Sequence, residues 1–141
     1  MIIKYYSVNE ANKILPQLKA LVEEIKEKRE LLYNEIERHE LLEEEDKDNI
    51  LELMYTKTQI NTLDAEIREL IEIIESFGVY VKGLDPFLID FPSEHNGEAI
   101  FLCWKEGEER IEWWHKIHEG FAGRKHISEL NKDNPTKFFY K

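Results

Sequence analysis

Apolar residues recur at seven-residue spacing between Asn49 and Gly78, in two rows that fall on one face of a helix. The rows, which include one threonine, are Leu53, Ile60, Ile67 and Ile74, and Thr56, Leu63, Leu70 and Phe77. A matching stripe between Val8 and about Glu45 would cover that face. The pattern therefore predicts a long antiparallel helical hairpin, similar to a coiled coil, over residues 8–78.

Local signals mark the ends of the two predicted helices. A capping box from Ser7 to Glu10 starts the first helix at Val8, and Gly78 suits the left-handed residue that ends the second. Pro16 is expected to kink or split the first helix, because it lacks an N–H and its ring clashes with the preceding turn. Three heptad positions of the first helix are polar, so the seam should weaken along it: Lys28, Glu35 and His39.

The pattern alternates after Gly78 and predicts a three-stranded antiparallel meander. Its strands are Leu88–Phe91, Glu98–Trp104 and Glu109–Trp114, with turns at Asn96-Gly97 and Glu106-Gly107. Counting from these turns places Cys103 opposite both Asp90 and Arg110. One face is then apolar and should pack on the helices: Ile89, Phe91, Ile100, Leu102, Trp104, Ile111 and Trp113. The other face collects Asp90, Phe101, Cys103, Arg110, Glu112 and Trp114.

These elements predict a single α+β domain over residues 1–141, with the hairpin at 8–78, the meander and a glycine–arginine loop at 79–127, and a C-terminal tail at 128–141. Residues 2–6 should be extended and pair with or pack on a sheet. The aromatic end, Phe138-Phe139-Tyr140, docks either on this domain or on a partner. Apolar residues outside the seam need a further cover, for which the sheet and a second copy of the chain are both expected: Leu31, Leu51, Ile71 and Ile73.

Charge and cysteine content narrow the range of functions. The net charge is −11, and residues 8–78, with 19 acidic and 9 basic residues, supply −10 of it. Such a field disfavours binding to nucleic acid. Cys103 is the only cysteine, which excludes an intrachain disulfide and suits a reducing compartment. The sequence has no secretory signal pattern and no apolar run of membrane-spanning length, so we expect a cytoplasmic protein without a membrane partner.

Two interpretations fit the predicted row of Asp90, Cys103 and Arg110. The arginine could lower the pKa of the thiol and make Cys103 reactive. Alternatively, Asp90 and Arg110 form an ordinary ion pair across the strands, beside a small buried residue. We favour the second interpretation, because free cysteines are commonly buried.

The spacing of His115, His118 and Glu119 permits a zinc site, since one helical turn would bring all three to one face. No second cysteine or histidine pair supports such a site, and His115 is also placed to pack beside Trp114. The sequence therefore predicts no metal and no cofactor, and keeps these three residues only as an alternative.

The segment Gly120-Phe121-Ala122-Gly123-Arg124 predicts a compact loop. Amides freed by Gly120 and Gly123, together with Arg124, could hold a carboxylate or a phosphate. In the structural interpretation, which we favour, the glycines allow positive φ angles and Arg124 binds an acidic residue such as Asp90 or Glu119.

Several short motifs occur in an order that resembles the bacterial domain of unknown function 2203 family. They are Tyr5 to Ala11 with Leu15-Pro16, Asp90-Phe91-Pro92, Leu102-Cys103-Trp104, Trp114-His115 and Gly120 to Arg124. The resemblance covers Lys4 to about Arg124. It implies that these positions form one module, and it brings no established activity.

Two functions are compatible with these patterns. The first, which we favour, is a non-catalytic protein-interaction or scaffold module that acts through the hairpin, as a homodimer or with an unidentified protein partner. The second is a small-molecule or anion-binding protein, an enzyme being one form of it, with a site where the sheet meets the glycine loop. Its candidate residues are Asp90, Cys103, Arg110, His115, Gly120, Gly123 and Arg124.

Overall fold

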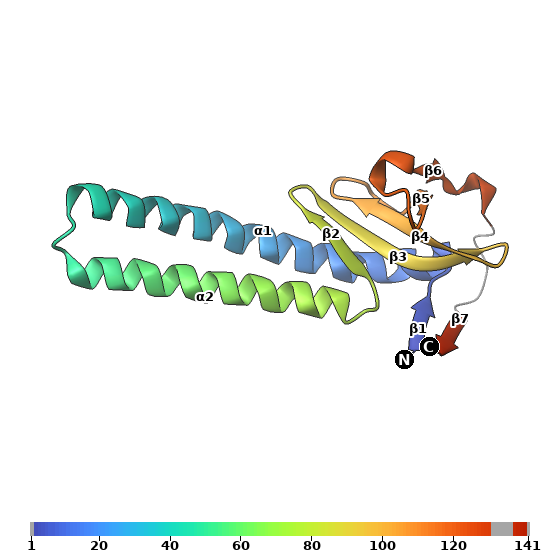
Figure 1. The fold of residues 1–141 in the computed structure, drawn as a ribbon, viewed down its shortest axis with the longest axis horizontal. Helices are drawn as coiled ribbons and strands as arrows, with labels where there is room; N and C mark the ends of the chain where they lie inside the picture. The colour runs from blue at the N-terminus through green and yellow to red at the C-terminus, as the bar shows by residue number, and fades with distance from the viewer. Residues whose placement is uncertain (1, 131–136, 141) are drawn as a thin grey trace. The chain divides into compact units, whose positions relative to one another are not determined.

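Two compact units make up the chain: Met1–Lys19 with Ile74–Lys141, and Ala20–Ile73. The structure, a computed structural model, describes residues 2–130 and 137–140, with side chains from Lys4 to Leu130. Its helices and strands are β1 (Ile2–Tyr5), α1 (Val8–Glu45), α2 (Ile50–Glu75), β2 (Tyr80–Leu84), β3 (Phe87–His95), β4 (Glu98–Lys105), β5 (Trp113–Lys116), β6 (Lys125–His126) and β7 (Lys137–Tyr140), with 3₁₀ turns at Phe121–Gly123 and Ile127–Glu129 (Figure 1). The predicted α+β class is confirmed.

The unit of residues 20–73 consists of two antiparallel helical segments that lie side by side (Figure 1). The antiparallel direction follows from contacts between them: Lys28 Nζ lies 3.6 Å from Glu66 Oε1, and His39 Nδ1 lies 2.7 Å from Thr56 Oγ1. All predicted heptad positions of this unit are buried or half-buried, as expected for a seam. The three polar positions lie in the same seam, and Glu35 Oε2 is buried there without a hydrogen-bond partner among the described residues.

The predicted helix ends are largely confirmed. The capping box forms, with the Ser7 amide donating to Glu10 Oε1 over 3.0 Å and the Glu10 amide donating to Ser7 Oγ over 3.1 Å. Gly78 adopts a left-handed conformation with φ of 85°, although α2 itself ends at Glu75. Pro16 does not split the first helix, because α1 runs through it as one element.

The other unit is built on a five-stranded antiparallel sheet in the order β2-β3-β4-β5-β6, so the prediction of three strands is wrong. The Asn96-Gly97 turn is confirmed, with φ angles of 52° and 79°. It fixes the predicted register between β3 and β4, in which Asp90 pairs with Cys103. The two added strands, β2 and β6, extend the sheet at its two edges.

The predicted third strand, Glu109–Trp114, is also wrong, because β5 begins only at Trp113. The turn at Gly107 does form. However, the Lys105 amide donates to the side chain of Glu108 over 2.7 Å, whereas in the predicted hairpin it would donate to the backbone carbonyl of Glu108. Further along, the Asn12 side chain takes both backbone groups of Ile111: it accepts from the amide (2.8 Å) and donates to the carbonyl (3.5 Å). Residues 108–112 are therefore held away from β4.

This change of register exchanges the faces of two tryptophans. Cys103 pairs with Trp113 instead of Arg110, and Leu102 pairs with Trp114 instead of Ile111. A shift of three residues turns every side chain of the strand to the opposite face. Trp114 is consequently buried with the apolar residues, and Trp113 lies on the face of Cys103.

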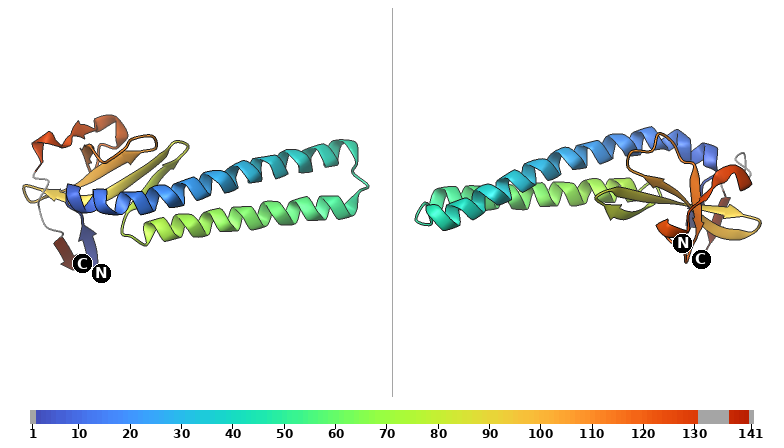
Figure 2. Two further views of the ribbon diagram at one scale, coloured as in Figure 1. Left: turned by 180° about the vertical axis from the view of Figure 1, so that it is seen from behind. Right: turned by 90° about the horizontal axis from the view of Figure 1, so that it is seen from above.

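The core of this unit lies between the apolar face of the sheet and the first turns of α1 (Figure 2). Tyr6, which precedes α1, packs edge-on against Phe91 with ring centroids 5.5 Å apart. On the helix side the buried residues are Val8, Ala11, Leu15 and Leu18 of α1. On the sheet side they are Phe87, Ile89, Phe91, Ile100, Leu102, Trp104 and Trp114, joined by Ile111 of the connection between β4 and β5. The predicted packing of an apolar sheet face on helix is thus confirmed for these turns.

A separate two-stranded ribbon joins the ends of the chain. β1 pairs antiparallel with β7, with Ile2 opposite Tyr140. The extended N-terminal segment is confirmed, and the strand Lys137–Tyr140 of the predicted tail pairs within its own unit. Residues 131–136 and 141 of that tail lie outside the described residues. Across the part of the chain with a described structure, neither α1 nor α2 has the length and apolar character that crossing a membrane would require.

Replacing Asn12 with alanine should lower the free energy of unfolding by about 1–3 kcal/mol, because it strips the Ile111 amide of its partner. Denaturant unfolding measures this change, and hydrogen exchange at the Ile111 amide should accelerate in the same variant. Asn34→Ala, at an exposed position of the same helix, controls for the higher helix propensity of alanine. Equal stabilities of the two variants would contradict the role given to Asn12.

Candidate functional site

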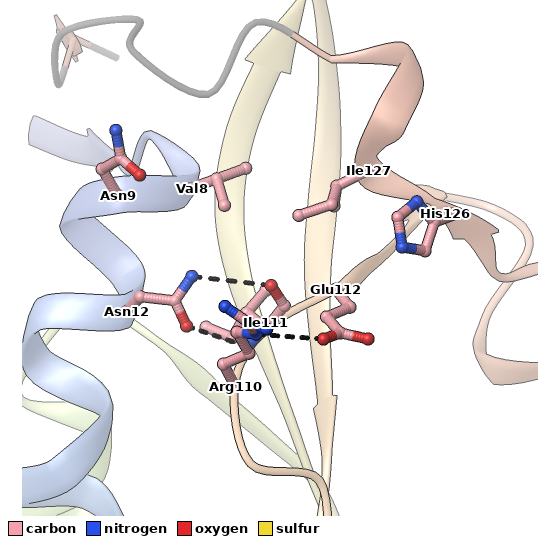
Figure 3. Close-up of a pocket in the computed structure, with 8 residues that line it drawn as sticks. All are labelled: Val8, Asn9, Asn12, Arg110, Ile111, Glu112, His126 and Ile127. Atoms are coloured by element: carbon pink, nitrogen blue, oxygen red, sulfur yellow. Dashed lines mark hydrogen bonds and ion pairs between the residues drawn. The ribbon is translucent and has the colours of Figure 1, made fainter.

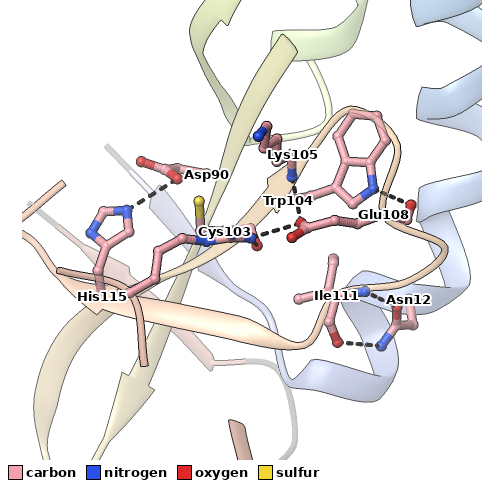
Figure 4. Close-up of polar contacts among 9 residues, drawn as sticks. Asn12, Asp90, Cys103, Trp104, Lys105, Glu108, Ile111 and His115 are labelled. Atoms are coloured by element: carbon pink, nitrogen blue, oxygen red, sulfur yellow. Dashed lines mark hydrogen bonds and ion pairs between the residues drawn. The ribbon is translucent and has the colours of Figure 1, made fainter. Parts of the chain in front are cut away.

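The second face of the sheet carries a buried cluster of three polar residues from three neighbouring strands. Asp90 of β3 and Cys103 of β4 are direct partners, and His115 of β5 pairs with Phe101, which shares the face of Cys103. Their exposed fractions are 4%, 1% and 2%. The three side chains point toward one another (Figure 4). We call them the Asp–Cys–His cluster.

The polar atoms of the Asp–Cys–His cluster lie close enough to share one small ligand. His115 Nε2 is 3.2 Å from Asp90 Oδ1. One carboxylate oxygen of Asp90, one ring nitrogen of His115 and Cys103 Sγ all lie within 4.8 Å of one another. With bonds of about 2.0–2.3 Å to one tetrahedral ion, such atoms lie roughly 3.3–3.6 Å apart, which falls inside this limit.

The second nitrogen of His115 fixes the arrangement of protons. Nδ1 lies 2.8 Å from the carbonyl oxygen of Lys116, and a carbonyl can only accept, so Nδ1 carries the hydrogen. In a neutral imidazole, Nε2 then presents a lone pair to the carboxylate of Asp90. Two lone pairs facing each other in a buried place repel. A hydrogen or a cation must therefore lie between the two atoms, either as a proton carried by Nε2 or by Asp90 Oδ1, or as a metal ion.

Without a metal, Cys103 is a poor nucleophile. Burial first, and then the neighbouring Asp90 carboxylate, raise the pKa of its thiol from 9.0 to about 12. The thiol instead donates a hydrogen bond to Asp90. The alternative in which Arg110 lowers this pKa is wrong, since Arg110 is not a neighbour: its side chain is 71% exposed and its Nε contacts Glu112 Oε1 at 3.1 Å.

Arg110 lies instead at a different cavity, of about 310 Å³ (Figure 3). This cavity is lined by Val8, Asn9, Asn12, Arg110, Ile111, Glu112, His126 and Ile127. The predicted row of Asp90, Cys103 and Arg110 is therefore wrong, because the register of β5 puts Trp113 opposite Cys103 and His115 opposite Phe101. The ion pair expected between Asp90 and Arg110 is wrong as well, since Asp90 faces His115 and Arg110 faces Glu112.

Arg124 holds the backbone beside the cluster. Its Nη2 donates to the Cys103 carbonyl over 3.1 Å and to Glu108 Oε1 over 2.7 Å. The guanidinium lies over the rings of Trp113 and Phe121, at 5.2 and 4.7 Å from their centroids. The structural interpretation of this residue is confirmed, but its acidic partner is Glu108, in place of the expected Asp90 or Glu119.

A cavity of about 110 Å³ adjoins the Asp–Cys–His cluster. It is lined by the three cluster residues and by Lys82, Leu88, Ile117, Gly120 and Phe121. Gly120 has a φ of 76°, which glycine adopts without strain. Gly123 serves a different need, because a Cβ there would lie 2.7 Å from the Cβ of Glu119. The glycine loop thus closes one side of this cavity.

Comparison with known proteins places the chain. Residues 4–127 match the model of a family described as "Uncharacterized conserved protein (DUF2203)". The chain belongs to the DUF2203 family. This confirms the resemblance carried by the short motifs. Neither the curated proteins nor the solved structures contain a match.

The zinc site that the sequence permitted, with His115, His118 and Glu119 as ligands, is wrong for this chain. Within the described residues, the group close enough to share a metal is Asp90, Cys103 and His115. Glu119 accepts from Lys125 Nζ over 2.7 Å and from the Lys116 amide over 3.0 Å. These hydrogen bonds, that of Lys125 first, lower its pKa to about 2. Glu119 therefore braces the loop of the DUF2203 chain.

Sequence reasoning missed four residues that line the cavity of the DUF2203 chain: Lys82, Leu88, Ile117 and Phe121. Lys82 belongs to β2, a strand that was not predicted because Gly83 and a shift of register interrupt its alternation. The pairing of Asp90 with Cys103 was available from the Asn96-Gly97 turn. The sequence also named His115 as a candidate, but no local signal could have placed it beside Asp90 and Cys103, since its strand is set by the distant Asn12.

Native protein should react slowly with a thiol reagent such as dithiobis(nitrobenzoate) at neutral pH. The rise in pKa from 9.0 to about 12 reduces the thiolate fraction about a thousandfold, and burial slows access further. Absorbance of the released thiolate gives the rate, with urea-unfolded protein as the reference. Modification as fast as in the unfolded chain would contradict the buried, hydrogen-bonded thiol.

Proposed function

We propose that this protein binds one divalent transition-metal ion, with zinc the best match, between Asp90 Oδ1, Cys103 Sγ and His115 Nε2. A mixed set of thiolate, imidazole and carboxylate suits zinc, which accepts all three. Magnesium and calcium prefer oxygen ligands only. The sequence had predicted no metal, so this proposal replaces that expectation.

The contact between His115 Nε2 and Asp90 Oδ1 carries the proposal. With bonds of about 2.0–2.1 Å to nitrogen and oxygen, two ligands of a tetrahedral zinc lie roughly 3.3 Å apart. The observed separation is 3.2 Å. An ion would also take the place of the proton that the two facing lone pairs otherwise need between them.

Charge balance further supports an ion at this place. A deprotonated Cys103 and the Asp90 carboxylate together carry a charge of −2, and neutral His115 adds none. A divalent cation makes the buried group neutral, which avoids the cost of an uncompensated charge away from water. Metal binding would displace the proton that the thiol otherwise donates to Asp90.

Two supporting contacts resemble those around known metal sites. A histidine ligand commonly donates its other N–H to a backbone carbonyl, as His115 Nδ1 does to Lys116. Arg124 holds the carbonyl of Cys103. With three protein ligands and a cavity beside them, the ion would keep one position for an exchangeable ligand, as catalytic zinc sites do.

A second function is favoured by the end of the helical unit at which α1 and α2 are connected. Five large apolar side chains are exposed there, and we call them the hairpin end: Leu41, Ile50, Leu51, Met54 and Tyr55. A shallow cavity of about 250 Å³ lies among them, lined by His39, Glu43, Ile50, Leu53, Met54 and Lys57. Seven acidic and two basic residues lie between Glu37 and Asp48. This combination fits a basic amphipathic helix of a partner protein, by charge and by apolar contact.

The metal proposal is tested on untagged protein, stripped of metal and titrated with Co²⁺ and then Zn²⁺. We expect one ion per chain by elemental analysis, and a thiolate-to-cobalt absorption band. Asp90→Asn, Cys103→Ser and His115→Gln should each weaken binding by more than about 100-fold, because even supporting residues contribute 10- to 100-fold.

His118→Gln is the matched control, an exposed histidine three residues from His115, and it should bind the ion as the unchanged protein does. Circular dichroism verifies that each variant folds. If His115 and Asp90 instead form a proton-bound ion pair, the band will be missing and Zn²⁺ will not raise the melting temperature.

The hairpin end is tested with a fluorescent synthetic helix of leucine and lysine, read by anisotropy. Leu51→Glu, at a side chain that is 81% exposed, should weaken binding by roughly tenfold or more, and Leu31→Glu, outside the hairpin end, should not. A leucine–glutamate helix of the same pattern should not bind. If light scattering gives the mass of two chains and Leu51→Glu halves it, a second copy covers this surface instead.

A further inference from the structure

Beside the Asp–Cys–His cluster lies a lysine, Lys82, that has no carboxylate partner among the residues that the structure describes. Lys82 lines the same cavity as the three cluster residues. The register between β2 and β3 shifts between Val81 and Gly83, so Lys82 has no opposite residue, and such bulges redirect side chains. Among the contacts of the described residues, its ammonium meets only the rings of Tyr80 and Phe101, at 5.7 and 5.0 Å from their centroids.

We infer that the cavity binds a small organic monocarboxylate, whose carboxylate bridges the metal ion and the Lys82 ammonium. The inference rests on the metal site proposed above and names the ligand of its open position. Lys82 and the three residues that would hold the ion line the same small space, so one carboxylate bound there could contact both the ion and the ammonium.

The charges of the proposed site favour a ligand with one negative charge. The ion with Asp90, Cys103 and His115 is neutral as a group, and Lys82 adds one positive charge. A monoanion therefore completes a neutral site, whereas a dianion such as hydrogen phosphate leaves one negative charge in excess. An uncompensated charge in a partly buried place is costly.

The remaining walls of the cavity select a short apolar chain. Leu88, Ile117 and Phe121 line it, and the last two are 51% and 42% exposed, which leaves an open apolar rim. A volume of about 110 Å³ admits a ligand of several non-hydrogen atoms. A carboxylate at the ion would leave its hydrocarbon chain against these three side chains.

Butyrate, acetate, inorganic phosphate and butylamine are the probes, each titrated into Co²⁺-loaded protein while the visible cobalt bands are followed. Butyrate should shift the bands saturably and bind roughly tenfold more tightly than acetate, because two more methylenes are buried. Phosphate should bind more weakly than butyrate, and butylamine should leave the bands unchanged.

The variant Lys82→Gln distinguishes binding of the carboxylate from binding of the metal ion. It should weaken butyrate roughly tenfold or more while the Co²⁺ affinity stays within about twofold. Lys47→Gln, an exposed lysine of the other unit, should change neither.

The outcomes are distinct. Protein that binds Co²⁺ but shows no butyrate effect, or an effect that Lys82→Gln leaves intact, overturns this inference and leaves the metal site standing. Equal binding of acetate and butyrate overturns the apolar part of the ligand. Protein that binds no Co²⁺ overturns both proposals, because the inferred carboxylate has no ion to bridge.

Discussion

The pair of hydrogen bonds between Asn12 and the backbone of Ile111 decides which residues meet on the sheet. These bonds join residues 99 positions apart and hold the connection after β4 against α1. Strand β5 can then pair with β4 only from Trp113 onward. In the alternative register, with Cys103 opposite Arg110, His115 would lie on the apolar face. One polar contact in the core thus places Trp114 in the apolar layer and His115 beside Asp90 and Cys103.

Burying the Asp–Cys–His cluster lowers the stability of the fold. A carboxylate, an imidazole and a thiol are withdrawn from water together, and buried polar groups cost free energy unless each finds a partner. Protons alone can satisfy the cluster as an imidazolium–carboxylate pair with a thiol donor. The proposed divalent ion would satisfy the cluster with the same neutral total, because it would replace the proton of the imidazolium and that of the thiol.

The sequence predicted those features that depend on neighbouring residues. The capping box at Ser7, the Asn96-Gly97 turn and the heptad rows are local patterns, and each appears in the structure. The pairing of Asp90 with Cys103 followed from that turn. The register of β5 could not be predicted, because a side chain of α1 sets it, and strand β2 was missed because its alternation breaks at Lys82.

The loop between β5 and β6 joins the ion-binding and ligand-binding parts of the proposed site. Its first end follows His115, and its middle supplies Ile117, Gly120 and Phe121 to the cavity wall. Its far end is anchored by Arg124, which bonds the carbonyl of Cys103. Both ends are therefore fixed to residues of the cluster or to their backbone, whereas Ile117 and Phe121 between them are 51% and 42% exposed, with Phe121 packed on the Arg124 guanidinium. The fold consequently lets the ligand pocket vary in this loop without altering the three side chains that would hold the ion.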